Sequence, residues 1–209
     1  MKVLGGATNS TRTADQTESA LFWADGAGTE TPPGHRNKIA RDIAAAQGNT
    51  LDENARLFAL LNIAMADAAI CAWDAKYTFD FWRPVTAIRN GEADGNPATD
   101  PDPAWTSFIA TPPFPDYASG HSTFSGAAAS VLAHFYGTDD IAFAAGSDFL
   151  PGVQRSFTSF SAAAEEAALS RLYGGIHYRS ANEDGLQAGI GIGSYVSQYF
   201  LQPKSRKRK

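Results

Sequence analysis

Apolar residues recur along this 209-residue chain at the spacing of helices rather than in the alternation typical of strands. The stretch LFWADGAGTETPPGHRNKIARDIAAAQG predicts a short helix, a Gly/Pro turn and a second helix that ends near Gly48. The sequence TLDE at 50–53 forms a capping box, and a long helix follows from about Asp52 to Phe81 or beyond. We expect Pro84 to end or kink this helix, because proline has no backbone N–H.

The helical pattern resumes after a long segment, 90–118, that is rich in Gly, Pro and Asp and predicts a loop with one short turn around Trp105. HSTFSGAAASVLAHFYG predicts a helix whose small residues let a neighbouring helix approach closely. SAAAEEAALSRLYGG predicts another helix, and SANE at 180–183 is a second capping box before the last one. No clear strand pattern is present, so we expect an all-α helical bundle.

Composition agrees with a globular protein, since 44% of the residues are hydrophobic and 19% are charged. We expect one helical catalytic domain over residues 1–203 and a disordered basic tail over 204–209. Five of the 17 basic residues lie in that tail, which leaves 12 against 22 acidic residues in the body. This balance argues against nucleic-acid binding through a general basic face. The tail alone could serve as a localisation signal or contact an anionic surface.

The sequence also bears on compartment and redox chemistry. The most apolar run, LFALLNIAMADAAICAW, is interrupted by Asn62 and Asp67 and predicts a buried helix rather than a membrane span. The first residues lack the apolar stretch of a secretory signal, so we expect a soluble protein of unassigned compartment. The single cysteine, Cys71, excludes an intrachain disulfide and predicts a small buried residue, with a nucleophile as the remote alternative.

Candidate chemistry is concentrated in three segments, of which the first is WDAKYTFDFWRPVTAIRN. Lys76 and Arg83 are seven residues apart, which on one continuous helix puts both on one face about 10 Å apart. Two cations on a largely apolar face require a compensating anion, unless they snorkel or pair with Asp74 and Asp80. From this segment alone, both interpretations stay open.

The second segment is the start of the helix that follows residue 118, where Ser119, Gly120 and His121 stand together. A helix start leaves backbone N–H groups unpaired and carries partial positive charge, so it favours anions. Gly120 would allow its backbone N–H to approach a ligand closely. The alternative is that Ser119 is only an N-cap and His121 only a surface residue.

The third segment, SRLYGGIHYR, places Arg171 on a helix and His177 after a double-glycine break. A lone histidine at a helix end is commonly structural, but the glycines free the backbone to set His177 against a fixed target. Together the three segments supply permanent cations, neutral donors and two imidazoles, which suits a tetrahedral oxyanion. One imidazole could attack or coordinate the central atom while the other transfers a proton.

In this order, the three segments resemble the signature shared by vanadium-dependent haloperoxidases and the type-2 phosphatidic acid phosphatase superfamily. That signature is Lys, six residues, Arg-Pro; then Pro-Ser-Gly-His; then Ser-Arg, five residues, His. The matching residues here are Lys76…Arg83-Pro84, Ala118-Ser119-Gly120-His121 and Ser170-Arg171…His177. The resemblance extends from about Arg12 to Phe200.

The resemblance implies a role for each matched residue. His177 would be the axial ligand of vanadium, or the nucleophile on phosphorus, and His121 the acid–base residue. Asp25 would orient an anion-binding arginine such as Arg171. Trp73 and Phe114 would line the halide side, or be plain core aromatics. The groups implied to hold the oxygens of vanadate, or of phosphate or sulfate in its place, are Lys76, Arg83, Ser119, the Gly120 amide and Arg171.

The implied function is that of a vanadate-dependent haloperoxidase, which oxidises bromide or chloride with hydrogen peroxide to hypohalous acid. Lys76 would polarise the peroxide, and a small organic molecule would accept the halogen. The first alternative is a soluble acid phosphatase that acts through a phosphohistidine. The second is a non-catalytic helical module that binds oxyanions.

The chain departs from the family pattern at three points. Ala118 replaces the motif's proline, which softens the loop before the helix. Ala181 stands four residues after His177, where the family often has Asp, and Glu183 or Asp184 would have to substitute for it. Family haloperoxidases also commonly carry an additional helical half; without it apolar faces would be exposed, and a homo-oligomer would cover them.

Overall fold

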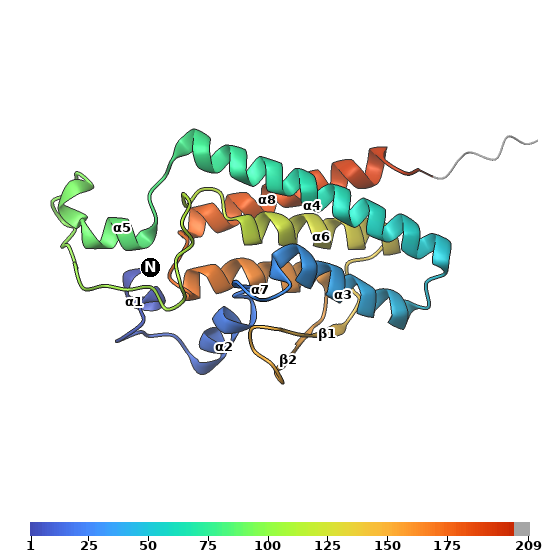
Figure 1. The fold of residues 1–209 in the computed structure, drawn as a ribbon, viewed down its shortest axis with the longest axis horizontal. Coiled ribbons are helices and arrows are strands. Elements are labelled where there is room, and N and C mark those ends of the chain that lie inside the picture. Colours follow the sequence, from blue (N-terminus) through green and yellow to red (C-terminus); the bar gives the residue numbers. More distant parts are fainter. Residues whose placement is uncertain (203–209) are drawn as a thin grey trace, which may run out of the picture.

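The structure is a computed structural model that describes residues 1–202, so the tail predicted at 204–209 lies outside the described residues. Helices dominate, as predicted, and they form a bundle (Figure 1). In chain order the elements are α1 (Lys2–Gly5), α2 (Ala14–Phe22), α3 (Thr31–Gln47), α4 (Leu51–Phe79), α5 (Pro84–Arg89), the 3-10 helix η1 (Gly91–Ala93), α6 (Gly120–Tyr136), β1 (Phe143–Gly146), β2 (Gln154–Phe157), α7 (Phe160–Tyr173) and α8 (Arg179–Tyr199).

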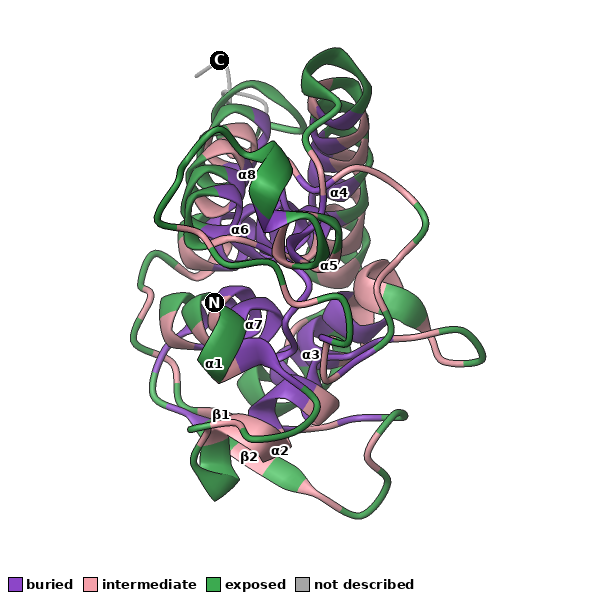
Figure 2. Ribbon diagram, turned by 90° about the vertical axis from the view of Figure 1, so that its left-hand side faces the viewer, coloured by how far each residue is buried: buried purple, intermediate pink, exposed green. Residues whose placement is uncertain are grey.

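Helix α6 is the centre of the bundle and packs against α3, α4, α7 and α8. Almost every residue of its first three turns is buried, and buried residues gather on α6 and α7 in Figure 2. The C-terminal ends of α4 and α7 and the N-terminal ends of α6 and α8 lie at the same end of the bundle (Figure 1). Residues from all three predicted segments therefore meet at that end.

Helices α6 and α8 are in close contact because glycines face backbone carbonyls. A Cβ atom added to Gly126 would collide with the carbonyl oxygen of Leu186, and one added to Gly189 would collide with that of Thr123. The small residues predicted to admit a neighbouring helix thus lie on both partners. Gly191, also on α8, is exposed and has no atom near the position of an added Cβ.

This difference between two glycines of one helix gives a matched stability test. We expect Gly189→Ala to lower the free energy of unfolding by about 1–3 kcal/mol, because the added methyl group forces α6 and α8 apart. Gly191→Ala should raise it by up to about 1 kcal/mol, because alanine is the better helix former in open space. Urea unfolding of both variants measures the two values, and equal effects would contradict the close contact.

Several predicted helix ends are confirmed. Gly48 is the C-cap of α3 in the left-handed conformation (φ 71°), and Thr50 and Glu53 form the capping box that begins α4. The capping box predicted at 180–183 is wrong: α8 begins at Arg179 with Tyr178 as its N-cap. The antiparallel pair β1–β2 was also missed, since strands of four residues each are too short to show an alternating pattern.

The prediction that one helix carries both Lys76 and Arg83 is wrong. Helix α4 ends at Phe79, and Asp80 adopts a left-handed conformation (φ 44°) that turns the chain. Arg83 is the N-cap of α5, and Pro84 begins that helix rather than ending the previous one. Proline suits the first position of a helix, because the N–H that it lacks would have no partner there.

Helix α4 is only partly covered by the rest of the fold. Cys71, predicted to be buried, is exposed, in an open groove between α4 and α8. Within residues 1–202, one helical segment, Leu51–Arg89, is long and apolar enough to cross a membrane by length and composition. A core helix meets the same criterion, and 39% of its most apolar window is buried in the bundle. The absence of a membrane span stays a prediction.

Candidate functional site

A cavity of about 620 Å³ opens where the four helix ends meet. Its wall is formed by the segment after α2, the end of α4, the loop 109–114, the start of α6, the end of α7 and the turn before α8. The predicted site residues that line it are Asp25, Trp73, Phe114, Gly120, His121, Arg171 and His177. Lys76, Arg83 and Ser119 are buried behind this wall.

The N-terminus of α6 presents its first turn to this cavity. Ser119 is the N-cap, and its hydroxyl accepts hydrogen bonds from the backbone N–H (3.4 Å) and the hydroxyl (3.0 Å) of Ser122. Gly120 lies against the indole of Trp73, because an added Cβ would sit 3.0 Å from that ring. The glycine therefore allows Trp73 to approach the helix start. Capping by Ser119 is present, and its contact with an anion stays a prediction.

Lys76 is fully buried, and the structure gives it partners other than an anion. Its ammonium donates to the carbonyl oxygens of Pro115 (3.0 Å), Asp116 (3.0 Å) and Ala118 (2.6 Å). An ammonium has three donors, so all of them are used to hold the loop that precedes His121. Burial and the neighbouring Arg83 lower the pKa of Lys76 to about 7. The predicted contact with an oxyanion would require one of these bonds to break.

Arg83 connects the loop before α6 to the turn before α8. Its Nε donates to the carbonyl of Phe114 (2.8 Å), and its Nη1 donates to the carbonyl of Ile176 (2.7 Å) and to Nε2 of His177 (3.1 Å). Its Nη2 is buried without a hydrogen-bond partner. Burial lowers the pKa of Arg83 to about 10, so the side chain is cationic at neutral pH.

Arg171 reaches the cavity from the end of α7. Its Nη1 donates to the carbonyl of Trp23 (2.6 Å), while its buried Nε has no partner. Burial lowers the pKa of Arg171 to about 9, and the carboxylate of Asp25 opposes that shift. Arg171 is therefore a partly satisfied cation that lines the cavity, whereas Arg83 lies behind its wall.

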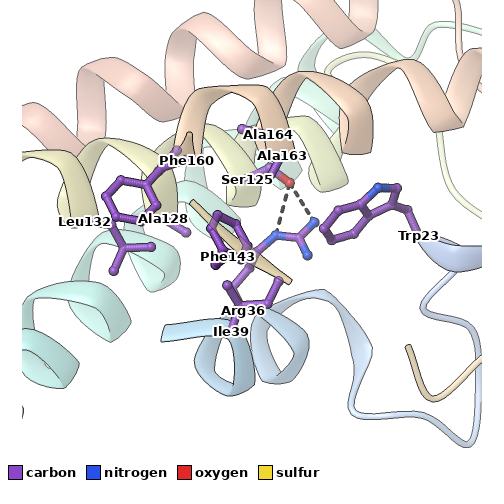
Figure 3. A pocket seen from close by; sticks show the side chains of 11 residues that line it. Trp23, Arg36, Ile39, Ser125, Ala128, Leu132, Phe143, Phe160, Ala163 and Ala164 are labelled. Atoms are coloured by element: carbon purple, nitrogen blue, oxygen red, sulfur yellow. Dashed lines mark hydrogen bonds between the residues drawn. The ribbon is translucent and has the colours of Figure 1, made fainter. Parts of the chain in front are cut away.

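A further buried cation, Arg36 on α3, was missed in the sequence. Its Nε (3.2 Å) and Nη2 (2.7 Å) donate to the hydroxyl of Ser125, beside a small cavity of about 20 Å³ (Figure 3). Its guanidinium also lies over the ring of Trp23, 4.3 Å from the centroid. Arg36 belongs to none of the three motifs, so the sequence showed only that it lies on a predicted helix.

His177 is buried, and its hydrogen-bond partner defines which nitrogen carries the proton. Burial, followed by the charges of Arg83 and Lys76, lowers the pKa of His177 well below its ordinary value, so the ring is neutral at pH 7. The guanidinium of Arg83 can only donate, so Nε2 is the nitrogen with the free electron pair. The proton is therefore on Nδ1, which lies 3.0 Å from Oδ1 of Asp116.

Of the two glycines before His177, one adopts a backbone conformation that favours glycine, and the other, Gly174, is in the ordinary right-handed region. Gly175 adopts φ 77°, in the left-handed region that disfavours side chains, and an added Cβ would collide with the backbone of Gly5. Helix α1 thus packs directly against the turn that carries His177. The substitutes proposed for the carboxylate missing at Ala181 are exposed, and Glu183 pairs with Arg179 at 3.6 Å instead.

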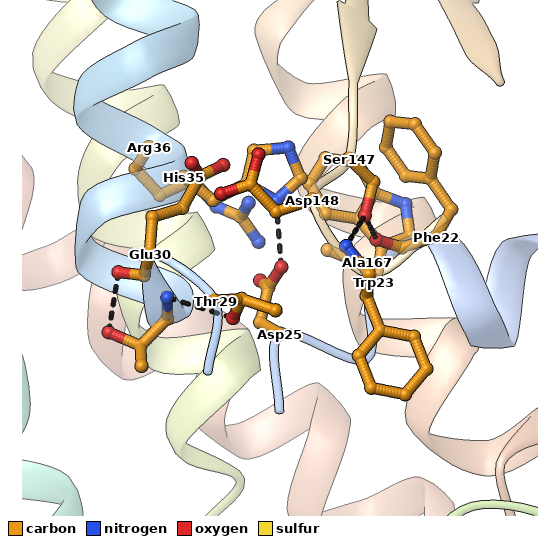
Figure 4. A network of polar contacts seen from close by, with 12 residues as sticks. Phe22, Trp23, Asp25, Thr29, Glu30, His35, Arg36, Ser147, Asp148 and Ala167 are labelled. Carbon is orange, nitrogen blue, oxygen red and sulfur yellow. Dashed lines mark hydrogen bonds and ion pairs between the residues drawn. The ribbon is translucent and has the colours of Figure 1, made fainter. Parts of the chain in front are cut away.

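Asp25 and His35, which are labelled in Figure 4, form a second histidine–carboxylate group together with His121. Nδ1 of His35 lies 2.9 Å from Oδ1 of Asp25, and its Nε2 lies 2.9 Å from the carbonyl oxygen of Gly146. Burial raises the pKa of Asp25, but the hydrogen bond to His35 and the charges of Arg36 and His121 outweigh it and lower the value overall. Both ring nitrogens of His35 therefore face oxygen atoms.

Asp25 was predicted to orient an arginine, but the structure gives His35 as its hydrogen-bond partner. Its second oxygen, Oδ2, lies 3.9 Å from Nε2 of His121. Burial and the charge of Arg171 lower the pKa of His121 well below its ordinary value, which leaves the ring neutral at pH 7. A neutral imidazole beside a carboxylate can accept a proton and be stabilised in its charged form.

Replacing the carboxylate tests this group. We expect Asp25→Asn to lower the free energy of unfolding at pH 7 by about 2 kcal/mol, because the charged partner of His35 is lost. The pKa of Asp25 lies below its ordinary 3.8 in the folded state, so its contribution is present above pH 3.8 and is lost as the pH falls further. The two proteins should therefore converge in stability below pH 3.8, and a constant difference down to pH 2 would contradict an ionised Asp25.

The polar atoms left without partners indicate what the cavity can hold. Buried donors without a partner among residues 1–202 include Nη2 of Arg83 and Nε of Arg171, and Nε2 of His121 is also unpartnered. A buried donor without a partner costs about 1–3 kcal/mol, so such groups mark the place of a ligand or water. Cationic donors beside a neutral imidazole fit a tetrahedral oxyanion such as vanadate or phosphate. In the same residues no cluster of His, Cys, Asp and Glu is suited to a bare metal ion.

A family model described as the VCPO second helical-bundle domain matches residues 56–204. The chain belongs to this family. Vanadium chloroperoxidase of Curvularia inaequalis is 39% identical to it over 158 residues, which are 64% of this chain and 25% of that protein. The family therefore confirms the resemblance to vanadium haloperoxidases that the three motifs indicated.

Solved structures agree with this family assignment. The structure described as the first bacterial vanadium-dependent iodoperoxidase superposes with a TM-score of 0.78 and 38% identity, over 88% of this chain and 44% of that one. A holo-type bacterial vanadium-dependent chloroperoxidase shares the fold, with a TM-score of 0.69 and 19% identity over 90% and 45% of the two chains. This chain thus spans a quarter of the curated relative and under half of these solved members of the family.

Proposed function

We propose that this protein binds vanadate in the cavity and oxidises a halide with hydrogen peroxide to hypohalous acid or its equivalent. The observation that carries the proposal is the neutral His177, whose unprotonated Nε2 lies beside the partly satisfied guanidinium of Arg83. Membership of the family and the 38% identity to an iodoperoxidase support the same chemistry. The candidate halides are bromide, chloride and, from that relative, iodide.

The proposed roles follow from the contacts of each side chain. His177 would hold vanadium through Nε2, which requires Nη1 of Arg83 to move from that nitrogen to an oxygen of the anion. Nε of Arg171, Nη2 of Arg83 and the first turn of α6 would hold the other oxygens. Bound vanadate would supply Lewis acidity that makes peroxide oxygen electrophilic toward a halide. Arg171 is held before the anion arrives by the bond of its Nη1 to the carbonyl of Trp23, so the rearrangement on binding is confined to Arg83.

His121 and the aromatic wall would complete the site. His121 would accept a proton from hydrogen peroxide, and the carboxylate of Asp25, 3.9 Å away, would stabilise the imidazolium. Trp73 and Phe114 line the cavity with ring centroids 5.2 Å apart. We propose that this apolar wall receives the halide. Lys76 would act through the loop that it holds, because its three donors are already used.

Two other functions use parts of the same geometry. An acid phosphatase would use the free electron pair on Nε2 of His177 to attack phosphorus, with the same donors around the phosphate. A non-catalytic module would bind the oxyanion without turnover. The donor set is equally suited to phosphate and vanadate, so the functions have to be separated by experiment.

The separating experiment uses the purified chain stripped of bound anions. Orthovanadate and hydrogen peroxide are added with iodide, bromide or chloride, and halogenation of a phenolic dye is followed. Halogenation that requires added vanadate supports the haloperoxidase. Hydrolysis of p-nitrophenyl phosphate that vanadate inhibits, without halogenation, would show the phosphatase. Binding of orthovanadate or phosphate with neither activity would leave the binding module.

A further inference from the structure

A buried carboxylate from outside the three motifs faces the histidine at the centre of the proposed site. Asp116 lies in the loop before α6 and is fully buried. Its Oδ1 is 3.0 Å from Nδ1 of His177, within hydrogen-bonding distance but not aligned for a hydrogen bond. Neither carboxylate oxygen forms a well-aligned hydrogen bond among residues 1–202, and the backbone N–H of Tyr178 is the other donor that faces the carboxylate. An unpartnered buried carboxylate beside an imidazole N–H needs an explanation.

The backbone of Asp116 is held on both sides, which presets the position of its carboxylate. Its N–H donates to the carbonyl of Phe81 (2.8 Å), and its carbonyl accepts from the ammonium of Lys76 (3.0 Å). Burial raises the pKa of Asp116 to about 7, and the charges of Arg83 and Lys76, which face the carboxylate, oppose this shift. Nη1 of Arg83 is 3.9 Å from Oδ1. Because Arg83 also donates to Nε2 of His177, the carboxylate and the guanidinium contact opposite nitrogens of the same ring.

We propose that Asp116 is a positioning residue for His177. Its carboxylate accepts a hydrogen bond from Nδ1–H, and this orients the ring so that the free electron pair of Nε2 points toward the bound oxyanion. This inference rests on the proposed function for the identity of the oxyanion, but the contact itself belongs to the anion-free protein. A small rotation of the ring aligns Nδ1–H with Oδ1. The carboxylate then increases the basicity of Nε2, as outer partners of ligating histidines commonly do.

Asp116 supplies from another segment the carboxylate that is missing four residues after His177. Position 181 holds a buried alanine, so nothing on α8 takes that place. The carboxylate comes instead from the loop that Lys76 holds. This arrangement also explains why a fully buried lysine is tied to the backbone of residues 115–118: the loop must be rigid for Asp116 to orient His177.

The test compares Asp116→Ala, Asp116→Asn and the control Glu183→Gln, which removes an exposed carboxylate on α8. We expect the affinity for orthovanadate, measured by calorimetry, to fall about 10–100-fold in Asp116→Ala. Asp116→Asn keeps an acceptor for Nδ1–H but loses the charge, so its affinity should fall measurably, by up to about tenfold, and less than that of Asp116→Ala. Glu183→Gln should bind as the unchanged protein does.

Nuclear magnetic resonance of the anion-free protein labelled with ¹⁵N-histidine gives a readout that does not depend on activity. The Nδ1 proton of His177 should exchange slowly with water in the unchanged protein and in Asp116→Asn, and rapidly in Asp116→Ala. Unchanged vanadate affinity together with an unchanged Nδ1 signal in Asp116→Ala would overturn the proposal. If Asp116→Ala does not fold, an affinity in Asp116→Asn equal to that of Glu183→Gln would overturn it. Absence of halogenation in all proteins would overturn only the proposed function, because the Nδ1 signal and the affinity for inorganic phosphate still report on Asp116.

Discussion

His177→Ala is expected to reduce vanadate-dependent halogenation by at least about 10³-fold, because removing a residue that binds the reacting centre commonly costs this much. The substitution removes the free electron pair of Nε2 and leaves the guanidinium of Arg83 facing an empty space. If the protein is a phosphatase, the same change removes the nucleophile and abolishes turnover. The measurement is the rate of dye halogenation, and of p-nitrophenyl phosphate hydrolysis, at saturating orthovanadate or substrate.

His134→Ala is the matched control for this prediction. His134 lies near the end of α6, is exposed, and hydrogen bonds to the carbonyl of Ser130 at 2.8 Å. It does not line the proposed site cavity, so its replacement should leave halogenation unchanged. Circular dichroism of both variants checks that they fold. Full activity in a folded His177→Ala would show that the chemistry occurs elsewhere.

Lys76→Met is expected to have the largest effect on stability, lowering the free energy of unfolding by about 3–5 kcal/mol. The substitution leaves the carbonyl oxygens of Pro115, Asp116 and Ala118 buried without their donor, and each such loss costs about 1–3 kcal/mol. Methionine fills much of the same space, so the cost comes from the polar groups. Urea unfolding at pH 7 measures the change.

Lys38→Met is the control for a lysine at the surface. Lys38 pairs with Glu30 (3.3 Å) and Asp148 (2.8 Å), and its side chain is 34% exposed. Surface pairs of this kind contribute at most about 1 kcal/mol, so Lys38→Met should change the free energy of unfolding by no more than that. A folded Lys76→Met of unchanged stability that no longer binds orthovanadate would show instead that Lys76 contacts the anion directly.

The helices and the order of the motifs could be predicted because both are local properties of the sequence. The apolar periodicity of α4, α6 and α7 and the capping box at Thr50 and Glu53 each involve residues within a few turns of one another. The spacing of Lys76 and Arg83 was wrongly assigned to one helix, because it too was judged from the local pattern alone. Periodicity cannot show that Asp80 turns the chain in a left-handed conformation, because the pattern of apolar positions carries no information about a single backbone dihedral.

The partners of the site residues could not be predicted, because they come from segments far apart in the chain. His35 and Arg36 stand on α3 and reach Asp25 and Ser125 only after α3 packs on the bundle. Asp116 lies just before the Ser119-Gly120-His121 motif, yet the sequence gives no sign that it faces His177, 61 positions further along. Once these polar groups are buried, they have to satisfy one another's hydrogen bonds, and which groups are buried is set by the packed fold.

By itself, the sequence determined the all-α class, the family and the identity of the cations and imidazoles, because these depend on residue type and spacing. Only the tertiary structure decided what each group contacts. It assigned the donors of Lys76 to three carbonyls, the carboxylate of Asp25 to His35, and the proton of His177 to the nitrogen that faces Asp116. The physical reason is that a buried polar group takes the nearest partner that packing provides, and packing brings together residues that the sequence keeps apart.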